Sequence, residues 1–342
     1  MFSHALHSMR RTAVPIAITG LLLTACAPGD TGDDQGGSVP STAASAEAST
    51  RTFVDITGES IEVPADPQRI VAIHDVNAGE QILSLGFELV GMATRDGEFD
   101  GEVAAVYELD GVEPVGDVYT PNVEAILALD PDLIVGEGYN GAGQDQFMEE
   151  GLQDQLEAIA PVVYIDTFRP VDDVMTEFAG LLGPSAEDEV ARQRDEYQAA
   201  IAEVSDELGD PNGLTAAVVG MRADDVVEAY GPETQVPSVI LTQLGIEQPD
   251  IVAEAEEAGG YLSISLERIP ELSADVILLD TGVGEFGGDY TGNALWQALP
   301  AVQAGQVYRW GAEWYGTTFH RFALALSEMG LALTAADRDV VE

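Results

Sequence analysis

The sequence predicts an α/β protein made of two similarly built lobes joined by one long helix. The first observation is that the segment Asn122–Val135, NVEAILALDPDLIV, returns without a gap as Ser265–Leu278, SLERIPELSADVIL. The second is that apolar, strand-like runs alternate with helical patterns around both copies, which favours mostly parallel sheets covered by helices. The third is a highly charged amphipathic stretch, Glu187–Leu208, between the two halves. A unit repeated at this distance predicts two lobes, each with its own sheet.

Each copy of the repeated segment has the pattern of a capped helix that runs into a buried strand. A helix N-cap residue, Asn122 or Ser265, is followed two positions later by Glu124 or Glu267. The cap side chain accepts a hydrogen bond from a free amide of the first turn, and a carboxylate there favours the positive end of the helix. The apolar residues then recur at three-residue spacing before the strand begins.

The charge of the chain limits the kinds of molecule that its surface can bind. Its 342 residues include 61 Asp plus Glu against 13 basic residues, all of them Arg, which gives a formal net charge of -48. Such a surface repels nucleic acid phosphates and anionic lipid headgroups, so we expect no nucleic acid partner. The 46% hydrophobic content is that of a globular protein with full cores.

The N-terminus carries the pattern of a targeting segment. Arg10 and Arg11 precede the apolar run Ala13–Leu23, which is too short to span a bilayer, and Cys26 follows at once in the sequence LTAC. This pattern resembles the lipobox of bacterial lipoproteins, which implies a signal peptide over 1–25, cleavage before Cys26 and lipidation of that residue. An ordinary secretory signal remains an alternative, and the export route, Sec or Tat, stays open. We expect an extracytoplasmic protein anchored to the cell membrane by lipid.

The rest of the chain divides by composition. Residues 26–50 are rich in Gly, Ser, Thr, Ala and Asp and predict a flexible tether. The expected domains are an N-terminal α/β lobe over 51–168, a linker with the interlobe helix over 169–211 and a C-terminal α/β lobe over 212–342. No later run reaches 18 apolar residues, so no transmembrane helix is expected after the signal.

Both lobes show the predicted alternation of elements. The first is expected to contain a hairpin (Thr52–Ile56 with Ser60–Val63), a strand (Arg69–Ile73), a helix (Ala78–Leu85), a strand (Leu89–Ala93), the first copy of the repeat, a helix (Gln144–Ile159) and a strand (Val162–Asp166). The second is expected to contain a strand (Thr215–Met221), a helix (Pro237–Leu244), the second copy, a helix (Ala294–Ala304), a strand (Gln306–Trp310) and a closing helix (Phe319–Ala335).

Five segments, taken in order, carry a family resemblance. They are VPADPQRIVAIHDVNAGEQILSLGFELVG (63–91), GDVYTPNVEAILALDPDLIV (116–135), LEAIAPVVYID (156–166), SISLERIPELSADVILL (263–279) and ALWQALPAVQAGQVYRW (294–310). Together they resemble the iron-siderophore and cobalamin class of substrate-binding proteins for ABC importers. The resemblance implies the class III periplasmic-binding-protein fold, with two Rossmann-like lobes joined by a single long α-helix and the ligand between the lobes.

The resemblance also implies two docking residues. In the family, a surface Glu on each lobe docks onto the permease dimer that works with its ATPase, and the matching positions here are Glu124 and Glu267. The alternative is that each Glu serves only the electrostatics of its own helix.

Ligand residues are expected where strands end, because ligands of open α/β sheets bind outside the carboxyl ends of the strands. This rule predicts that the ligand is bound by residues among His74, Asp75, Arg95, Glu137, Arg222, Trp310, Trp314 and Tyr315. It also predicts a ligand contact for Tyr119 if the strand order is as expected. In hydroxamate-binding members of the class, a Tyr in the loop after the strand that follows the first docking helix contacts the siderophore, and Tyr139 holds that place. The position of their Arg before this helix is taken here by Val118 or Tyr119, a departure from the pattern.

Some of these residues have a structural alternative. Trp310 and Trp314 also fit a core, and Arg222 also fits a salt bridge to Asp224 or Asp225. Aromatic faces and a guanidinium suit a bulky chelate with oxygen acceptors, through stacking and bidentate hydrogen bonds. With Asp75 and Glu137 near the cleft, we expect a neutral or cationic chelate such as a ferric hydroxamate.

No cofactor is expected, and iron is expected only as a siderophore chelate. Apart from the signal, the chain has two histidines, His74 and His320, and Cys26 is its only cysteine. The sequence contains no G-x-S-x-G, H-E-x-x-H or P-loop motif and no Lys, so it predicts a binding protein, a monomer, rather than an enzyme. Haem or cobalamin as the ligand remains an alternative, and a secreted hydrolase is a distant one.

Overall fold

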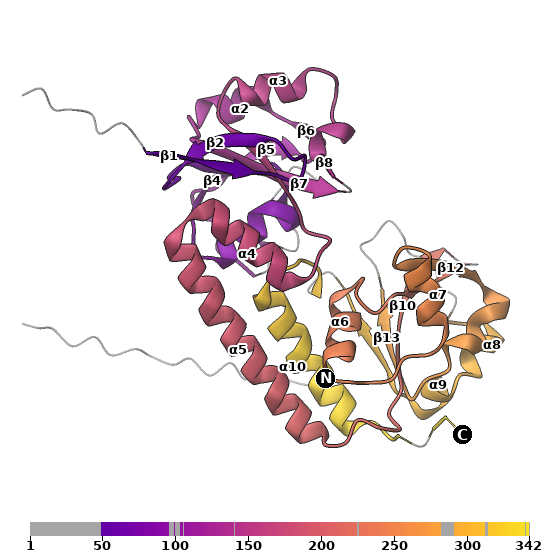
Figure 1. Cartoon of the computed structure of the whole chain (residues 1–342). Coiled ribbons are helices and arrows are strands. Elements are labelled where there is room, and N and C mark those ends of the chain that lie inside the picture. The colour runs from indigo at the N-terminus through magenta and orange to yellow at the C-terminus, as the bar shows by residue number, and fades with distance from the viewer. Residues whose placement is uncertain are drawn as a thin grey trace, which may run out of the picture. The chain divides into compact units, whose positions relative to one another are not determined.

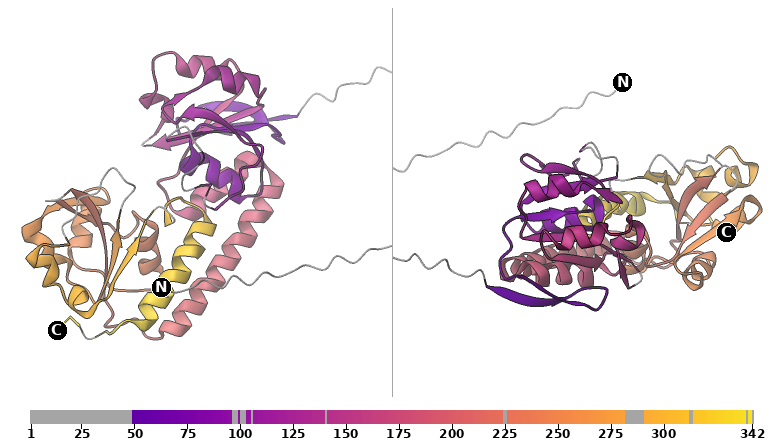
Figure 2. Two further views of the ribbon diagram at one scale, coloured as in Figure 1. Left: turned by 180° about the vertical axis from the view of Figure 1, so that it is seen from behind. Right: turned by 90° about the horizontal axis from the view of Figure 1, so that it is seen from above.

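The computed structural model describes residues 49–342, except 96–98, 100–102, 105, 140, 224–225, 282–290, 312–313, 339 and 342, and for 221–223 it describes the backbone alone. The predicted signal peptide, the lipidation site Cys26 and nearly all of the predicted tether lie outside the described residues. Residues 47–342 form one compact unit (Figures 1 and 2), and the domain boundaries proposed within it stay predictions. None of the helices described is long and apolar enough to cross a membrane.

The described chain opens with the predicted hairpin, β1 (Thr50–Val54) and β2 (Ser60–Pro64), which pair antiparallel. Asp55 follows the first strand, and its Oδ1 accepts hydrogen bonds from the backbone amide of Thr57, at 2.9 Å, and from the Thr57 hydroxyl. This local bonding is typical of an Asx turn, which reverses the chain within a few residues.

The first half builds one seven-stranded sheet in the order β6-β5-β4-β3-β7-β8, with β9 also paired to β7. Its strands are β3 (Ile70–Ala72), β4 (Leu89–Thr94), β5 (Glu113–Asp117), β6 (Thr120–Pro121), β7 (Leu133–Tyr139), β8 (Ala142–Gly143) and β9 (Val162–Asp166). The central strands β4, β3, β7 and β9 run parallel. Their sequences are mostly apolar because both faces of a parallel sheet are buried.

The helices of this half are shorter and less regular than predicted. They are the π-helical turn η1 (Asp75–Gly79), α1 (Glu80–Ser84), α2 (Val123–Ala128), the 3-10 helix η2 (Gln144–Phe147) and α3 (Leu152–Glu157). The prediction of one helix over Gln144–Ile159 is wrong. Met148 is extended and Gly151 has a φ of 82°, so the chain leaves and re-enters helical geometry between η2 and α3.

Two long helices follow, α4 (Val171–Leu182) and α5 (Pro184–Leu208). Gly183 separates them with a φ of 105°, a conformation that favours glycine. The predicted interlobe helix is confirmed and starts three residues earlier than expected, because Pro184 is well suited to the first helical position. Figures 1 and 2 show α5 running alongside the last helix, α10 (Phe319–Ala335), against which it packs.

The second half builds a five-stranded sheet in the order β12-β11-β10-β13-β14. Its strands are β10 (Ala216–Ala223), β11 (Val226–Tyr230), β12 (Tyr261–Ser265), β13 (Val276–Asp280) and β14 (Val307–Trp310). Strands β10, β13 and β14 are parallel, but β10-β11-β12 are antiparallel. Strands β11 and β12 were not predicted from the sequence, and the expectation of mostly parallel pairing is wrong for this edge of the sheet.

The helices around this sheet are α6 (Val236–Gln243), α7 (Ile251–Glu257), the 3-10 helix η3 (Leu266–Leu272), α8 (Ala294–Gln297), α9 (Pro300–Ala304) and α10. The predicted helix over Ala294–Ala304 is broken in two. Pro300 disfavours a helical conformation in the residue before it, and Leu299 accordingly has a ψ of 138°. The closing helix Phe319–Ala335 is confirmed at both ends.

The two copies of the repeat agree in their strands and differ in their helices. Asn122 caps α2, because its Oδ1 accepts a hydrogen bond from Ala125 N at 3.1 Å. In the second copy Ser265 makes no such bond, and η3 contains Pro270, which has no N–H for an α-helical bond. The prediction of two equivalent capped α-helices is therefore wrong for the second copy.

The aspartate before each repeated strand accepts hydrogen bonds from backbone amides near the start of the neighbouring strand in both sheets. Asp132 accepts hydrogen bonds from Gln68 N at 2.8 Å and Arg69 N at 3.0 Å, at the start of β3. Asp275 accepts from Thr215 N at 2.8 Å, just before β10. Each carboxylate thus joins its own strand to the neighbouring parallel strand. In this feature the two copies of the repeat have the same structure.

Candidate ligand-binding cleft

A cleft of about 790 Å³ lies where strands of both sheets end, within the volume range of sites for small molecules. Residues at or just after the ends of β4, β7 and β9 line one side of it, and residues at or just after the ends of β11, β13 and β14 line the other. The polar and aromatic residues that line the cleft include Asn77, Arg95, Tyr139, Thr167, Phe168, Arg169, Tyr230, Glu233, Thr234, Gln235, Glu256, Tyr261, Asp280 and Tyr315.

The first-sheet side combines exposed aromatic rings with guanidinium groups. Tyr139 and Phe168 are exposed by 43% and 55% and meet edge to face, with ring centroids 5.3 Å apart. Arg169 forms an ion pair with Glu177, while Arg95 follows β4 and is exposed. Aromatic faces beside a guanidinium suit a bulky ligand that carries oxygen acceptors.

The second-sheet side is built on a buried carboxylate. Asp280 ends β13 and is only 4% exposed. It accepts hydrogen bonds from the hydroxyl of Tyr230, at 2.9 Å, and from that of Tyr315, at 2.7 Å. Burial, and after it the negative charge of Asp280, raises the pKa of Tyr230, so this phenol stays protonated.

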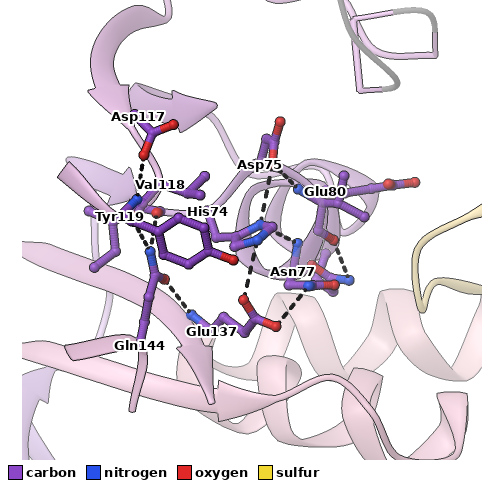
Figure 3. A network of polar contacts seen from close by, with 12 residues as sticks. His74, Asp75, Asn77, Glu80, Asp117, Val118, Tyr119, Glu137 and Gln144 are labelled. Carbon is purple, nitrogen blue, oxygen red and sulfur yellow. Dashed lines mark hydrogen bonds and ion pairs between the residues drawn. The ribbon is translucent and has the colours of Figure 1, made fainter. Parts of the chain in front are cut away.

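A polar network lies behind Asn77, on the first-sheet side (Figure 3). The fully buried His74 accepts a hydrogen bond from Asn77 N at its Nδ1 atom, over 3.1 Å, and its Nε2 lies 3.2 Å from Glu137 Oε2. The other oxygen of Glu137 accepts from Asn77 Nδ2 at 3.1 Å. Gln144 accepts from the amide of Glu137 at 3.0 Å. The network therefore fixes both the backbone and the side chain of a residue that lines the cleft.

Asp75 belongs to the far end of the same network. Burial would raise its pKa, but its contact with the His74 ring, the amide of Val76 and the charge of Arg95 together lower it. The carboxylate does not line the cleft and instead borders a separate small hollow beside Met92.

The residues nominated from the sequence fall into distinct places. Arg95, Tyr139 and Tyr315 line the cleft, whereas His74 and Glu137 support it from behind through Asn77. Arg222 lies at the end of β10, where only the backbone is described.

The remaining three aromatic residues lie outside the lining. Tyr119 is 43% exposed and packs edge to face with Phe147 at 6.0 Å. Trp310 and Trp314, exposed by 1% and 3%, stack on each other at 5.8 Å. The rings of Trp310 and Tyr315 meet edge to face, with centroids 5.4 Å apart, so the tryptophan pair supports a ring that lines the cleft and does not itself line it.

Several lining residues were not nominated from the sequence. Phe168 follows β9, and Asp280 ends β13, so the strand-end rule already applied to other strands would have found both. Tyr230 and Tyr261 were missed because the strands β11 and β12 were missed. Asn77 gave no signal of its own, since its place depends on the π-helical turn η1.

The two proposed docking residues are exposed at the starts of their helices. Glu124 lies in the first turn of α2, and Glu267 lies in the first turn of η3. The Ser265 hydroxyl, and after it the backbone amide of Glu267, lowers the pKa of the Glu267 carboxyl. The Ser265 hydroxyl thus hydrogen-bonds with this carboxylate and does not accept a hydrogen bond from a backbone amide of the helix. Within the described residues, no three His, Cys, Asp or Glu side chains gather in a way that fits a metal ion.

Comparisons with known proteins agree with this architecture. The model of a family described as periplasmic binding protein matches residues 84–314. The probable siderophore-binding lipoprotein YfiY of Bacillus subtilis (strain 168) is 28% identical over 274 residues, which cover 76% of this chain and 79% of the relative. The iron(3+)-hydroxamate-binding protein FhuD of the same organism is 28% identical over 262 residues, covering 73% and 76%.

Solved structures show the same fold. The structure of Staphylococcus aureus SirA complexed with staphyloferrin B aligns with a TM-score of 0.67 at 22% identity, over 85% of this chain and 100% of that one. The predicted fold class, two α/β halves joined by a long helix, is confirmed by this match and by the two sheets.

Proposed function

The chain belongs to the periplasmic binding protein family, and from that premise we propose that it is the substrate-binding protein of an ABC importer and captures a ferric siderophore in the cleft. The observation that carries the proposal is the cleft itself, with strand ends from two sheets, two exposed aromatic rings and Arg95 around about 790 Å³. The names of the relatives support a siderophore as the ligand class. Iron then arrives already chelated, and the protein binds and releases the chelate without transforming it.

The ligand we favour is a neutral or cationic ferric hydroxamate. The formal net charge of -48 repels a multiply anionic chelate such as a ferric catecholate, and Glu233, Glu256 and Asp280 bring negative charge to the lining itself. Arg95, placed on the opposite side, suits the oxygen atoms of a hydroxamate. The relative named for iron(3+)-hydroxamate binding supports this choice.

Two further parts of the proposal concern the membrane. Lipidation at Cys26 would anchor the protein on the outer side of the cell membrane, and the word lipoprotein in the name of one relative supports this. Glu124 and Glu267 would dock onto the permease dimer, and their exposure at the starts of α2 and η3 supports that role.

A competitive panel of ferric chelates tests the ligand class. Trp310 reports on the cleft because its ring contacts Tyr315, so binding is expected to quench tryptophan fluorescence. We expect a ferric trihydroxamate to bind tightest, and tightest binding of a ferric catecholate would refute the choice. Haem or corrin absorption in the purified protein would assign the cleft to those ligands instead.

A further inference from the structure

One ring nitrogen of His74 lies between a hydrogen-bond donor and an acceptor (Figure 3). Its Nδ1 atom is 3.1 Å from Asn77 N, which donates to it, and 3.3 Å from Asp75 Oδ1. A ring nitrogen without a hydrogen accepts, whereas both nitrogens of the charged imidazolium donate. The Nδ1 atom therefore pairs with the Asn77 amide while it is bare, and with the Asp75 carboxylate once it carries a hydrogen.

Glu137 fixes which nitrogen of the neutral ring carries the hydrogen. The Nε2 atom of His74 lies 3.2 Å from Glu137 Oε2, and an ionised carboxylate accepts without donating. The neutral ring therefore keeps its hydrogen on Nε2 and leaves Nδ1 bare toward Asn77. The His74 side chain has no exposure to solvent, so the protein itself must supply both partners of the ring.

The place of Asn77 depends on the bond to Nδ1. His74 is the N-cap of η1, and the amides of a first helical turn have no partner within the helix. Asn77 is only 9% exposed and has a φ of -106° and a ψ of 19°, outside the helical region. A buried amide that loses its acceptor is costly, so loss of the cap favours a shift of this residue. Because Asn77 lines the cleft, such a shift changes the surface that meets the ligand.

The charges around the ring leave an acceptor ready for a protonated Nδ1. The elements α1, β7, β4 and β3 pack on η1. Asp75 belongs to η1 itself, Glu137 to β7 and Glu80 to α1, where it is held in the buried ion pair with α10, while Arg95 follows β4 and β3 is apolar. Although burial opposes it, neighbouring groups lower the pKa of Asp75, so its carboxylate is charged at neutral pH and in mild acid.

We propose that His74 is a positioning residue whose protonation weakens ligand binding, because the charged ring gives up the Asn77 amide and donates to Asp75 instead. The inference rests on the proposed function and adds the regulation of its site by pH. Histidine ordinarily changes its charge between about pH 5 and pH 8. Since the ligand binds the form with neutral His74 better, affinity is full at the upper end of this range and falls as the pH falls.

Equilibrium dialysis of a linear ferric trihydroxamate against the purified full-length protein tests the proposal. We expect the affinity to fall about tenfold between about pH 8 and about pH 5.5, while the visible absorption of the chelate checks that its iron stays bound. His320→Gln is the control, since His320 is the other histidine after the predicted signal and is exposed on α10, and it is expected to keep this fall. Equal affinities at the two pH values would overturn the inference and leave the proposed function standing. If the chelate bound at neither pH, the proposed function would fall, and the inference with it.

Two substitutions of His74 separate the cap from the charge of the ring. Asparagine is a preferred N-cap residue, and its Oδ1 accepts from the Asn77 amide at any pH, so His74→Asn is expected to bind with nearly equal affinity at the two pH values. The glutamine of His74→Gln keeps an amide donor for Glu137 but places no acceptor at the Nδ1 position, so we expect weak binding at both. A fall in affinity that persists in His74→Asn would contradict the inference. So would His74→Gln binding as tightly as the parent at the higher pH, since the charge and not the cap would then matter.

Hydrogen exchange of the Asn77 amide in the parent protein needs neither a variant nor a ligand. We expect the amide to be protected at about pH 8 and to exchange about tenfold faster, relative to an unstructured amide at the same pH, at about pH 5.5. Equal protection at the two pH values would overturn the inference even if the His74 variants failed to fold.

Discussion

Arg321 and Glu80 form an ion pair in which neither side chain is exposed to solvent. Arg321 Nη2 lies 3.2 Å from Glu80 Oε2, and the pair joins α10 to α1. Removing one partner leaves the other charge buried without compensation, which typically costs about 3–5 kcal/mol of unfolding free energy. We therefore expect Glu80→Gln to lower the stability to urea by that amount.

The control for this prediction is an ion pair on the surface. Arg192 contacts Glu189 and Glu196 on α5, where the charges are solvated and screened. Arg192→Gln is expected to leave the urea midpoint nearly unchanged. If the two variants lost the same stability, burial would not be the cause of the effect.

Asp75 links stability to acid pH. Its pKa in the folded protein is lowered from 3.8, although burial alone would raise it. The carboxylate therefore contributes stability that is fully present above the unfolded pKa and is lost as pH falls through the lower folded pKa. We expect the unfolding free energy of Asp75→Asn to depend less on pH than that of the parent between about pH 4 and pH 2. Parallel pH curves for the two proteins would contradict the assignment.

At the scale of elements, α2 and η3 are the two helices that present the proposed docking carboxylates. Reversing both charges in Glu124→Arg with Glu267→Arg replaces attraction to a basic partner by repulsion. We expect uptake of the ferric chelate by cells to be abolished while its affinity for the purified protein stays unchanged. Glu271→Gln, in η3 and paired with Arg268, is a control in the same helix. Normal uptake by the double variant would refute docking at these residues.

The elements predicted best are those that depend on local sequence. The helices α5 and α10 have long amphipathic patterns and clear ends, and both are confirmed. The strands β11 and β12 were missed because Val226–Tyr230 and Tyr261–Ser265 are short, and each is placed by its neighbour in the sheet, β11 by β10 and β12 by β11, rather than by its own sequence. The two copies of the repeat agree in their strands, while a single proline, Pro270, gives the second helix a different geometry.

The candidate site was harder to foresee than the fold for a similar reason. A strand-end rule finds the positions of Arg95, Tyr139 and Tyr315, since it depends on topology alone. It does not tell an exposed ring from a buried one, and Trp310 and Trp314 are buried because each stacks on the other. Such placement depends on packing between segments far apart in the sequence.

The charge of the whole molecule predicts a dependence on salt. With a formal net charge of -48, the compact state is destabilised by repulsion between its own carboxylates. Screening shortens the reach of this repulsion from about 30 Å at 0.01 M salt to about 8 Å at 0.15 M. We expect the thermal midpoint to rise over this range of sodium chloride. Choline chloride at the same ionic strength checks that screening, rather than a sodium site, is responsible, and a midpoint that falls with salt would contradict the prediction.

The packing of α10 against α5 and its ion pair with α1 have a consequence for how the chain is completed. A polypeptide made from its N-terminus has Glu80 in place long before Arg321 exists, and until then that carboxylate must stay in water. While the chain is still growing, the first sheet and its helices therefore cannot bury Glu80 without a penalty in folding free energy. Helix α10 supplies the positive charge that compensates Glu80. A chain that stops short of residue 321 therefore cannot bury this carboxylate as part of an ion pair, which disfavours folding.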